Sequence, residues 1–164
     1  LSGETSVGAF PLEVIKQMRR IIESVENSPL ITIPDQNIQC VNERYITKVI
    51  CHQAAILADT ITAEVITTLT DTGYTAFHIS SWRPKSNILV FSSNRRILAM
   101  LNLLWGVKSF YYEKLVSTDD TITDVNEIAR QKGFVKKGDF LINLAAMPIT
   151  DKGMVNTLRV SEIE

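Results

Sequence analysis

Residues 64–84 read EVITTLTDTGYTAFHISSWRP and predict a strand, a tight turn and a short helix in succession. The β-branched run Val65–Leu69 favours a strand buried in a sheet. Asp71-Thr72-Gly73 indicates a turn, because glycine accepts backbone angles that other residues resist. A strand that passes through such a turn into a helix N-terminus is where α/β proteins bind anions. The turn at Thr70–Thr75 is therefore the first candidate site.

Apolar residues recur along the rest of the chain at helical and strand spacing in alternation. The connection before the last strand is too short for a helical crossover, so that strand should pair antiparallel or lie at an edge. This alternation predicts an α/β fold, a three-layer α/β/α arrangement with a five-stranded, mostly parallel sheet whose last strand is antiparallel. Further helices are expected at residues 10–26, 42–63, 94–106 and 117–133, and further strands at 87–92, 109–112, 140–146 and 154–163.

The start of the chain has a different character. Leu1–Ala9 contains two glycines and three hydroxyl residues, which is typical of a loop rather than of a helix or strand. The chain begins inside this motif without a methionine, so we expect it to be an excerpt of a longer protein.

Composition and charge restrict the class of protein. The 164 residues suffice for one domain with a substantial core, and 45% hydrophobic with 21% charged residues is ordinary for a soluble globular protein. The net charge of −1 argues against a nucleic-acid binder. No apolar run reaches the roughly 18 residues of a membrane span, and no signal peptide is visible. Cys40 and Cys51 are expected to be reduced thiols in a cytoplasmic protein.

The sequence lacks the common motifs of catalysis and metal binding. It contains no GxSxG elbow, Walker A loop, zinc spacing or HExxH. His52 is interpreted as a partly buried structural residue, because no carboxylate or Cys/His cluster accompanies it. His78 has no acid or nucleophile near it in sequence. The residue patterns alone thus give a small α/β domain with one candidate anion site.

Three spaced segments resemble the pyruvate kinase family. Leu1–Glu13, LSGETSVGAFPLE, resembles the family motif LSGETAKGxYPxE, and Gly138–Val160 is similar to GDxxxxxxGxP followed by TNTxxV. Between them, the TDTGYT turn and Ile79–Asn94, ISSWRPKSNILVFSSN, are similar to TxTGxxA and ISxxRPxxPIxxxT. The segments follow in the family's order and cover nearly the whole chain.

The resemblance implies which part of such an enzyme the chain represents. Residues 1–27 would be a barrel-end remnant and linking helix, and 28–164 the C-terminal α/β regulatory and oligomerisation domain. Ser2, Gly3 and Glu4 would lie near the active site of the parent enzyme, at the end of its last barrel strand. The parent transfers the phosphoryl group of phosphoenolpyruvate to ADP in glycolysis, forming ATP, with Mg²⁺ and K⁺. The metal ligands and catalytic lysine belong to earlier segments, so we expect this chain alone to hold no cofactor and to be inactive.

In many members of the family, the C-terminal domain also binds a sugar-phosphate effector. The resemblance places that site on Thr70, Thr72, Gly73, Thr75, Lys152 and Gly153. Two residues depart from the family's pattern. Asp71 adds a carboxylate where a phosphate would bind, and Tyr74 stands where Lys or Arg is common. One carboxylate can offset much of what a helix N-terminus contributes, roughly 1 kcal/mol, so we expect weak binding.

The helix expected at Asn42–Ala63 carries more apolar and small residues than one sheet can cover. We therefore expect self-association, as a dimer of this chain and a tetramer of the parent, without nucleic-acid or membrane partners. Two alternatives remain open: a freestanding α/β protein that binds small anions, and an interaction module without catalysis. A barrel-length segment with acidic metal ligands ahead of Leu1 would separate the first hypothesis from both.

Overall fold

The computed structural model describes residues 2–28, 44–114, 117–148 and 154–164. Two compact units divide the chain, Leu1–Pro34 and Asp35–Glu164. Each unit is described by itself below.

The first unit contains two helices, α1 (Ser2–Ser6) and α2 (Pro11–Glu26). The loop expected at Leu1–Ala9 is wrong over α1, because Thr5 and Ser6 donate their hydroxyls to the carbonyl of Ser2 and so satisfy a helical turn locally. In α2, Pro11 occupies the start of the helix, where its missing N–H costs nothing. The apolar stripe of α2 is at least half exposed within this unit, at Leu12, Ile15, Ile22 and Val25.

The second unit is built on one sheet of five strands, in the order β3-β2-β1-β4-β5. β1 (Val65–Leu69) is central and pairs in parallel with β2 (Asn87–Ser92) on one side and β4 (Phe140–Ala145) on the other. β3 (Val107–Tyr111) extends the parallel sheet beyond β2, and β5 (Thr157–Glu162) pairs antiparallel with β4 at the opposite edge. The predicted fold class is therefore confirmed, including the antiparallel last strand.

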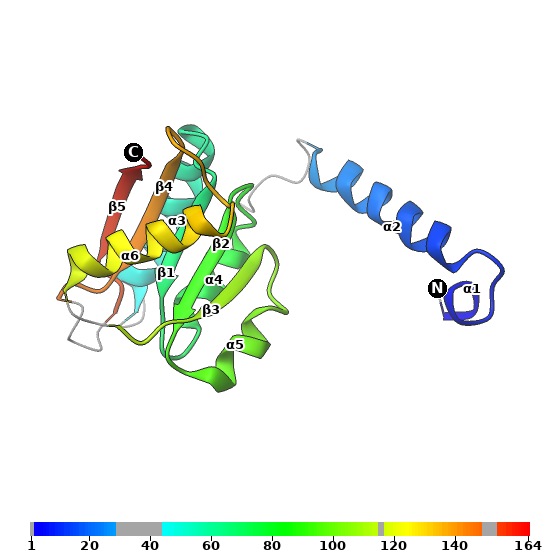
Figure 1. Ribbon diagram of the computed structural model, residues 1–164, viewed down its shortest axis with the longest axis horizontal. Helices are drawn as coiled ribbons and strands as arrows, with labels where there is room; N and C mark the ends of the chain where they lie inside the picture. Colours follow the sequence, from blue (N-terminus) through cyan, green and yellow to red (C-terminus); the bar gives the residue numbers. More distant parts are fainter. Residues whose placement is uncertain (1, 29–43, 115–116, 149–153) are drawn as a thin grey trace. The chain divides into compact units, whose positions relative to one another are not determined.

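Helices cover both faces of this sheet. α3 (Tyr45–Thr60), α4 (Tyr74–Ser81) and α5 (Arg95–Leu101) pack on one face, where their side chains join one apolar cluster with alternate residues of the strands. α6 (Thr118–Gln131) packs on the other face through Val125 and Ala129. Figure 1 shows α6 in front of the sheet, with α3 and α4 behind it. Because helices cover both faces, nearly every residue of β1 and β2 is buried, whichever face its side chain points to.

The helix predicted at residues 94–106 is shorter than expected. α5 ends at Leu101, because Asn102 donates its side-chain amide to the carbonyl of Leu98 and terminates the helical ladder. The same side chain accepts the backbone N–H of Ser109 at the outer edge of β3. Leu104 and Trp105 therefore follow the helix in a turn. The last strand is also shorter than expected, beginning at Thr157 rather than Met154.

Candidate functional site at the carboxyl end of β1

The turn at Thr70–Thr75 follows the carboxyl end of the central strand. The chain leaves β1 through α4, which packs on one face of the sheet, and returns as β2 beside β1. It reaches β4, the other neighbour of β1, through α6, which packs on the opposite face. Adjacent parallel strands whose connections diverge to opposite faces create the crevice in which α/β proteins bind ligands. The turn lies at the carboxyl end of β1, where this topology would place such a crevice, and its use as an anion site stays a prediction.

Gly73 fixes the shape of the turn. Its φ of 84° lies in the left-handed region that glycine tolerates, and it is the N-cap residue of α4. A Cβ at this position would stand 2.9 Å from Cδ2 of Leu101, which is buried in α5. The turn is thus packed directly against the neighbouring helix.

The threonine hydroxyls of the turn are already engaged with its backbone. The Oγ1 of Thr70 accepts the N–H of Gly73 at 2.9 Å, and the Oγ1 of Thr72 accepts the N–H of Tyr74 at 3.4 Å. Thr75 is buried, and its carbonyl accepts the thiol of Cys51 at 3.9 Å. Two of the N–H groups that would hold an anion at this helix N-terminus therefore have partners within the turn, which weakens the site relative to the sequence-based picture.

Asn94 ties the turn to the next strand–helix connection. Its side-chain amide donates to the carbonyl of Asp71 at 3.2 Å, while its Oδ1 accepts the N–H of Arg96 as the N-cap of α5. The Asp71 side chain is exposed, beside these groups. The predicted site residues Lys152 and Gly153 lie outside the described residues, so their approach to the turn stays a prediction.

A cation that the sequence reading missed comes from α3. The guanidinium carbon of Arg44 lies 4.9 Å from the ring centroid of Tyr74, the first residue of α4. Two further pairs follow along the two helices: Lys48 acts electrostatically on His78, and the ring of His52 stacks on Trp82 at 4.0 Å. The signal was present in the sequence, because positions 44, 48 and 52 and positions 74, 78 and 82 both advance by four.

The histidines and the described cysteine have structural surroundings. His52 is partly buried against Trp82, as its interpretation as a structural residue predicts. Burial first, and the charge of Lys48 second, lower the pKa of His78 below its usual value. Cys51 is a free, buried thiol whose pKa is raised by burial to about 12, so it is protonated at neutral pH. Cys40 and the expected start of the helix at Asn42 lie outside the described residues.

The described ranges contain few other features that could form a functional site. No group of three His, Cys, Asp or Glu side chains among these residues is arranged to hold a metal ion. No helix in the described part of the chain is long and apolar enough to cross a bilayer. Ser2, Gly3 and Glu4 lie together in α1, in the first unit. Their predicted proximity to an active site stays a prediction.

Comparison with known proteins identifies the family. The family model for the pyruvate kinase alpha/beta domain matches residues 48–161. The pyruvate kinase of Clostridium acetobutylicum is 29% identical over 164 residues, which are 100% of this chain and 35% of that protein. Pyruvate kinase 2 of Synechocystis is 30% identical, over 100% of this chain and 27% of its own length.

A solved structure agrees with these relatives. The crystal structure of a pyruvate kinase from Cryptosporidium parvum superposes with a TM-score of 0.76 at 25% identity, covering 100% of this chain and 32% of the other. The chain thus spans about a third of the proteins it matches. Because the family match extends from α3 through β5 and includes the β1–α4 turn, the chain belongs to the pyruvate kinase alpha/beta domain family.

Proposed function

We propose that this chain serves as the C-terminal regulatory and subunit-interface domain of a pyruvate kinase. The parent enzyme would transfer phosphoryl from phosphoenolpyruvate to ADP in the cytoplasm, in glycolysis, using Mg²⁺ and K⁺ held by segments outside this chain. The observation that supports the regulatory role is the position of the Thr70–Thr75 turn, which follows the central strand β1 at its carboxyl end in a domain of this family. By itself, the chain is expected to give no turnover in a coupled phosphoenolpyruvate–ADP assay.

The effector would be a sugar phosphate bound weakly at the turn. The N-terminus of α4 and the ring-stacked Arg44 favour a phosphate there. The carboxylate of Asp71 and the internal bonds of Thr70 and Thr72 oppose it. Fructose bisphosphate is a suitable probe, because either of its two phosphate groups could occupy the turn.

A melting-temperature titration tests this proposal. A ligand that binds only the folded state adds about 2.7 kcal/mol at a hundred times its Kd. We expect little response from the wild-type chain and a clear rise in melting temperature for Asp71→Ser. The double variant Asp71→Ser, Thr72→Val should lose part of that rise, because it removes a hydroxyl from the turn. If neither wild type nor Asp71→Ser responds, the turn is only structural and the effector role fails.

The subunit-interface role rests on the surface of α3. Ala54, Ala55 and Ala58 are buried within the fold, so they are not free to contact another subunit. Ile46 and Ile56 remain 42% and 40% exposed, and they are the apolar positions available to a partner. Sedimentation at tens of micromolar should detect a dimer that Ile46→Lys disrupts and that Met100→Lys, at an exposed position on α5, leaves intact. A wild-type monomer under these conditions would contradict the assignment.

A further inference from the structure

Helices α3 and α4 run side by side with three matched pairs of side chains between them. Arg44 lies over Tyr74, Lys48 acts on His78, and His52 stacks on Trp82. Along α4, the rings of Tyr74 and His78 meet edge to face at 4.3 Å. Each pair joins a basic residue of α3 or its N-cap, Arg44, to an aromatic ring of α4 or its C-cap, Trp82. Successive pairs are one helical turn apart, about 5.4 Å. We call these six residues the basic–aromatic ladder.

The first two pairs of the ladder lie in an environment without opposing charge among the described helices. α4 and α5 contain no carboxylate, and α5 begins with Arg95 and Arg96. The one acidic residue of α3, Asp59, lies near its C-terminus, where it accepts the backbone N–H of Lys85 at 3.4 Å. The remaining nearby carboxylate of the described residues is Asp71 in the turn. Glu43 precedes Arg44 in sequence, outside the described residues.

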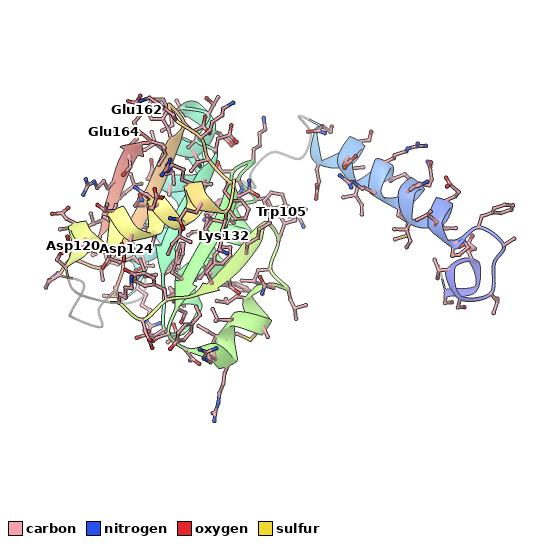
Figure 2. The ribbon with its side chains drawn as sticks, in the orientation of Figure 1. Trp105, Asp120, Asp124, Lys132, Glu162 and Glu164 are labelled. Atoms are coloured by element: carbon pink, nitrogen blue, oxygen red, sulfur yellow. The ribbon has the colours of Figure 1, made fainter. Side chains whose placement is uncertain are left out.

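The negative charge of the second unit gathers instead around α6. Its first turn contains Asp119 and Asp120, and Asp124 follows one turn later. Figure 2 shows Asp120 and Asp124 near the beginning of α6 and Lys132 near its end. Around α6, three of the carboxylates are paired with basic side chains, Asp119 with Arg159, Asp124 with Lys114 and Glu127 with Arg130. No such ion pair is present for Arg44 or Lys48 among the described residues, and unbalanced positive charge of this kind favours anion binding.

We propose that the ladder is an anion-binding site, in which Arg44, Lys48 and the protonated form of His78 hold a phosphate monoester on the outer face of α3 and α4. The site goes beyond the effector turn, because it uses side chains of the two helices and none of the threonine hydroxyls. Its ligand class is a small dianion, since Arg44 and Lys48 are cationic, His78 can accept a proton when the anion binds, and α4 contributes no carboxylate.

The geometry of each group suits this ligand. Stacking on Tyr74 restrains the guanidinium of Arg44 and leaves its N–H edge able to donate two parallel bonds to phosphate oxygens. Lys48 lies one turn along α3 and adds a point charge at the next pair. The N-terminus of α4 contributes further positive potential beside Tyr74. A phosphate group that touches two adjacent pairs would thus be bound by both helices.

His78 provides a direct readout of the ligand. The chain contains two histidines, so a proton–carbon NMR spectrum holds one imidazole signal from His78 and one from His52. Burial and Lys48 lower the pKa of His78 in the free protein. A bound dianion favours the protonated ring, and it should therefore move the titration of His78 upward while the His52 signal does not respond. Inorganic phosphate is the first probe, and sulfate, a dianion throughout this pH range, separates the titration of the ligand from that of His78.

Three variants of the 164-residue chain distinguish binding at the ladder from binding at the turn and from an effect of net charge alone. Lys48→Gln should weaken phosphate binding about tenfold, the cost of one charge-assisted contact. Lys132→Gln makes the same charge change at the end of α6 and should leave the affinity unchanged. Thr72→Val perturbs the effector turn and should also leave the His78 response intact.

Any one of three results would overturn the ladder site. An unchanged His78 titration at tens of millimolar phosphate would refute binding, and equal losses in Lys48→Gln and Lys132→Gln would indicate net charge alone. A response abolished by Thr72→Val but retained in Lys48→Gln would place the anion in the turn instead. Because the melting-temperature test of the turn depends on Asp71, the two proposals can fail separately. Circular dichroism of each variant verifies that it remains folded.

Discussion

Replacing Gly73 by alanine should destabilise the second unit in two separable ways. The residue has a φ of 84°, and an alanine in the left-handed region costs about 1–2 kcal/mol. Its new Cβ would also stand 2.9 Å from Cδ2 of Leu101, closer than side-chain carbons normally approach. Leu101 is buried and cannot swing into solvent, so relieving this overlap should cost a further 1–3 kcal/mol or so, as overpacking does in other cores.

Gly133 and Gly138 supply matched controls for this prediction. Their φ angles are 75° and 86°, and a Cβ at either position meets nothing within 4 Å. Gly133→Ala and Gly138→Ala therefore carry the backbone cost without the contact. Alanine also reduces the entropy of the unfolded chain, and this smaller opposing effect is common to all three variants. The difference between Gly73→Ala and the controls isolates the contact with Leu101.

Urea denaturation followed by tryptophan fluorescence measures these differences. Both tryptophans, Trp82 and Trp105, belong to the second unit, so their signal reports its unfolding without interference from α1 and α2. We expect the free energy of unfolding to fall by about 1 kcal/mol in the controls and by about 2–4 kcal/mol in Gly73→Ala. If Gly73→Ala costs no more than the controls, the close packing of the turn against α5 is refuted.

Three further predictions concern capping, thiol chemistry and pH. Asn94→Ala removes both the α5 cap and the bond to the Asp71 carbonyl, and it should cost about 1–2 kcal/mol in urea denaturation. Asn94→Ser keeps a capping oxygen but loses the amide donor, so it should cost less than Asn94→Ala; no cost at all in Asn94→Ser would mean that the bond to Asp71 contributes nothing. In a Cys40→Ser background, Cys51 should react with thiol reagents at pH 8 only as fast as the protein opens, because burial raises its pKa to about 12; rapid labelling in the folded state would contradict its burial. The pKa of His78 in the folded protein lies below the usual 6.5, so the folded protein favours the neutral ring and loses stability as the pH falls below about 6.5. His78→Gln should make the free energy of unfolding less sensitive to pH in that range. An unchanged pH dependence would refute the assignment.

The segment from β1 to α4 shows where local sequence patterns predicted the structure correctly. β1 begins and ends where its β-branched run does, and α4 opens directly after Gly73, because both depend on neighbours in sequence. The length of α5 was wrong, since its end is set by Asn102, which bonds backward to Leu98 and forward to Ser109. α1 was missed because serine and threonine, which favour loops, here bond to a carbonyl of their own turn.

In the candidate site, too, some features follow from sequence order and others only from the folded geometry. The position of the turn after a central strand followed from sequence order, but the engagement of Thr70 and Thr72 with backbone N–H groups depends on the turn's geometry. Arg44 was missed because its contact with Tyr74 joins two helices that are separated by the whole of β1. A four-residue period in each helix is visible in the sequence, whereas the alignment of one period against the other is a property of the packed fold.

The place of β1 at the centre of the sheet has a consequence for synthesis of the chain. Val65 pairs with Asn87 on one side, which follows soon in sequence, but with Leu141 on the other, which is made only after α4, β2, α5, β3 and α6. During translation, one edge of a strand that ends up buried therefore remains unpaired while most of the domain emerges from the ribosome. An open edge of this kind attracts other chains, so the interval before β4 appears is when the nascent protein is most exposed to aggregation and most in need of a chaperone.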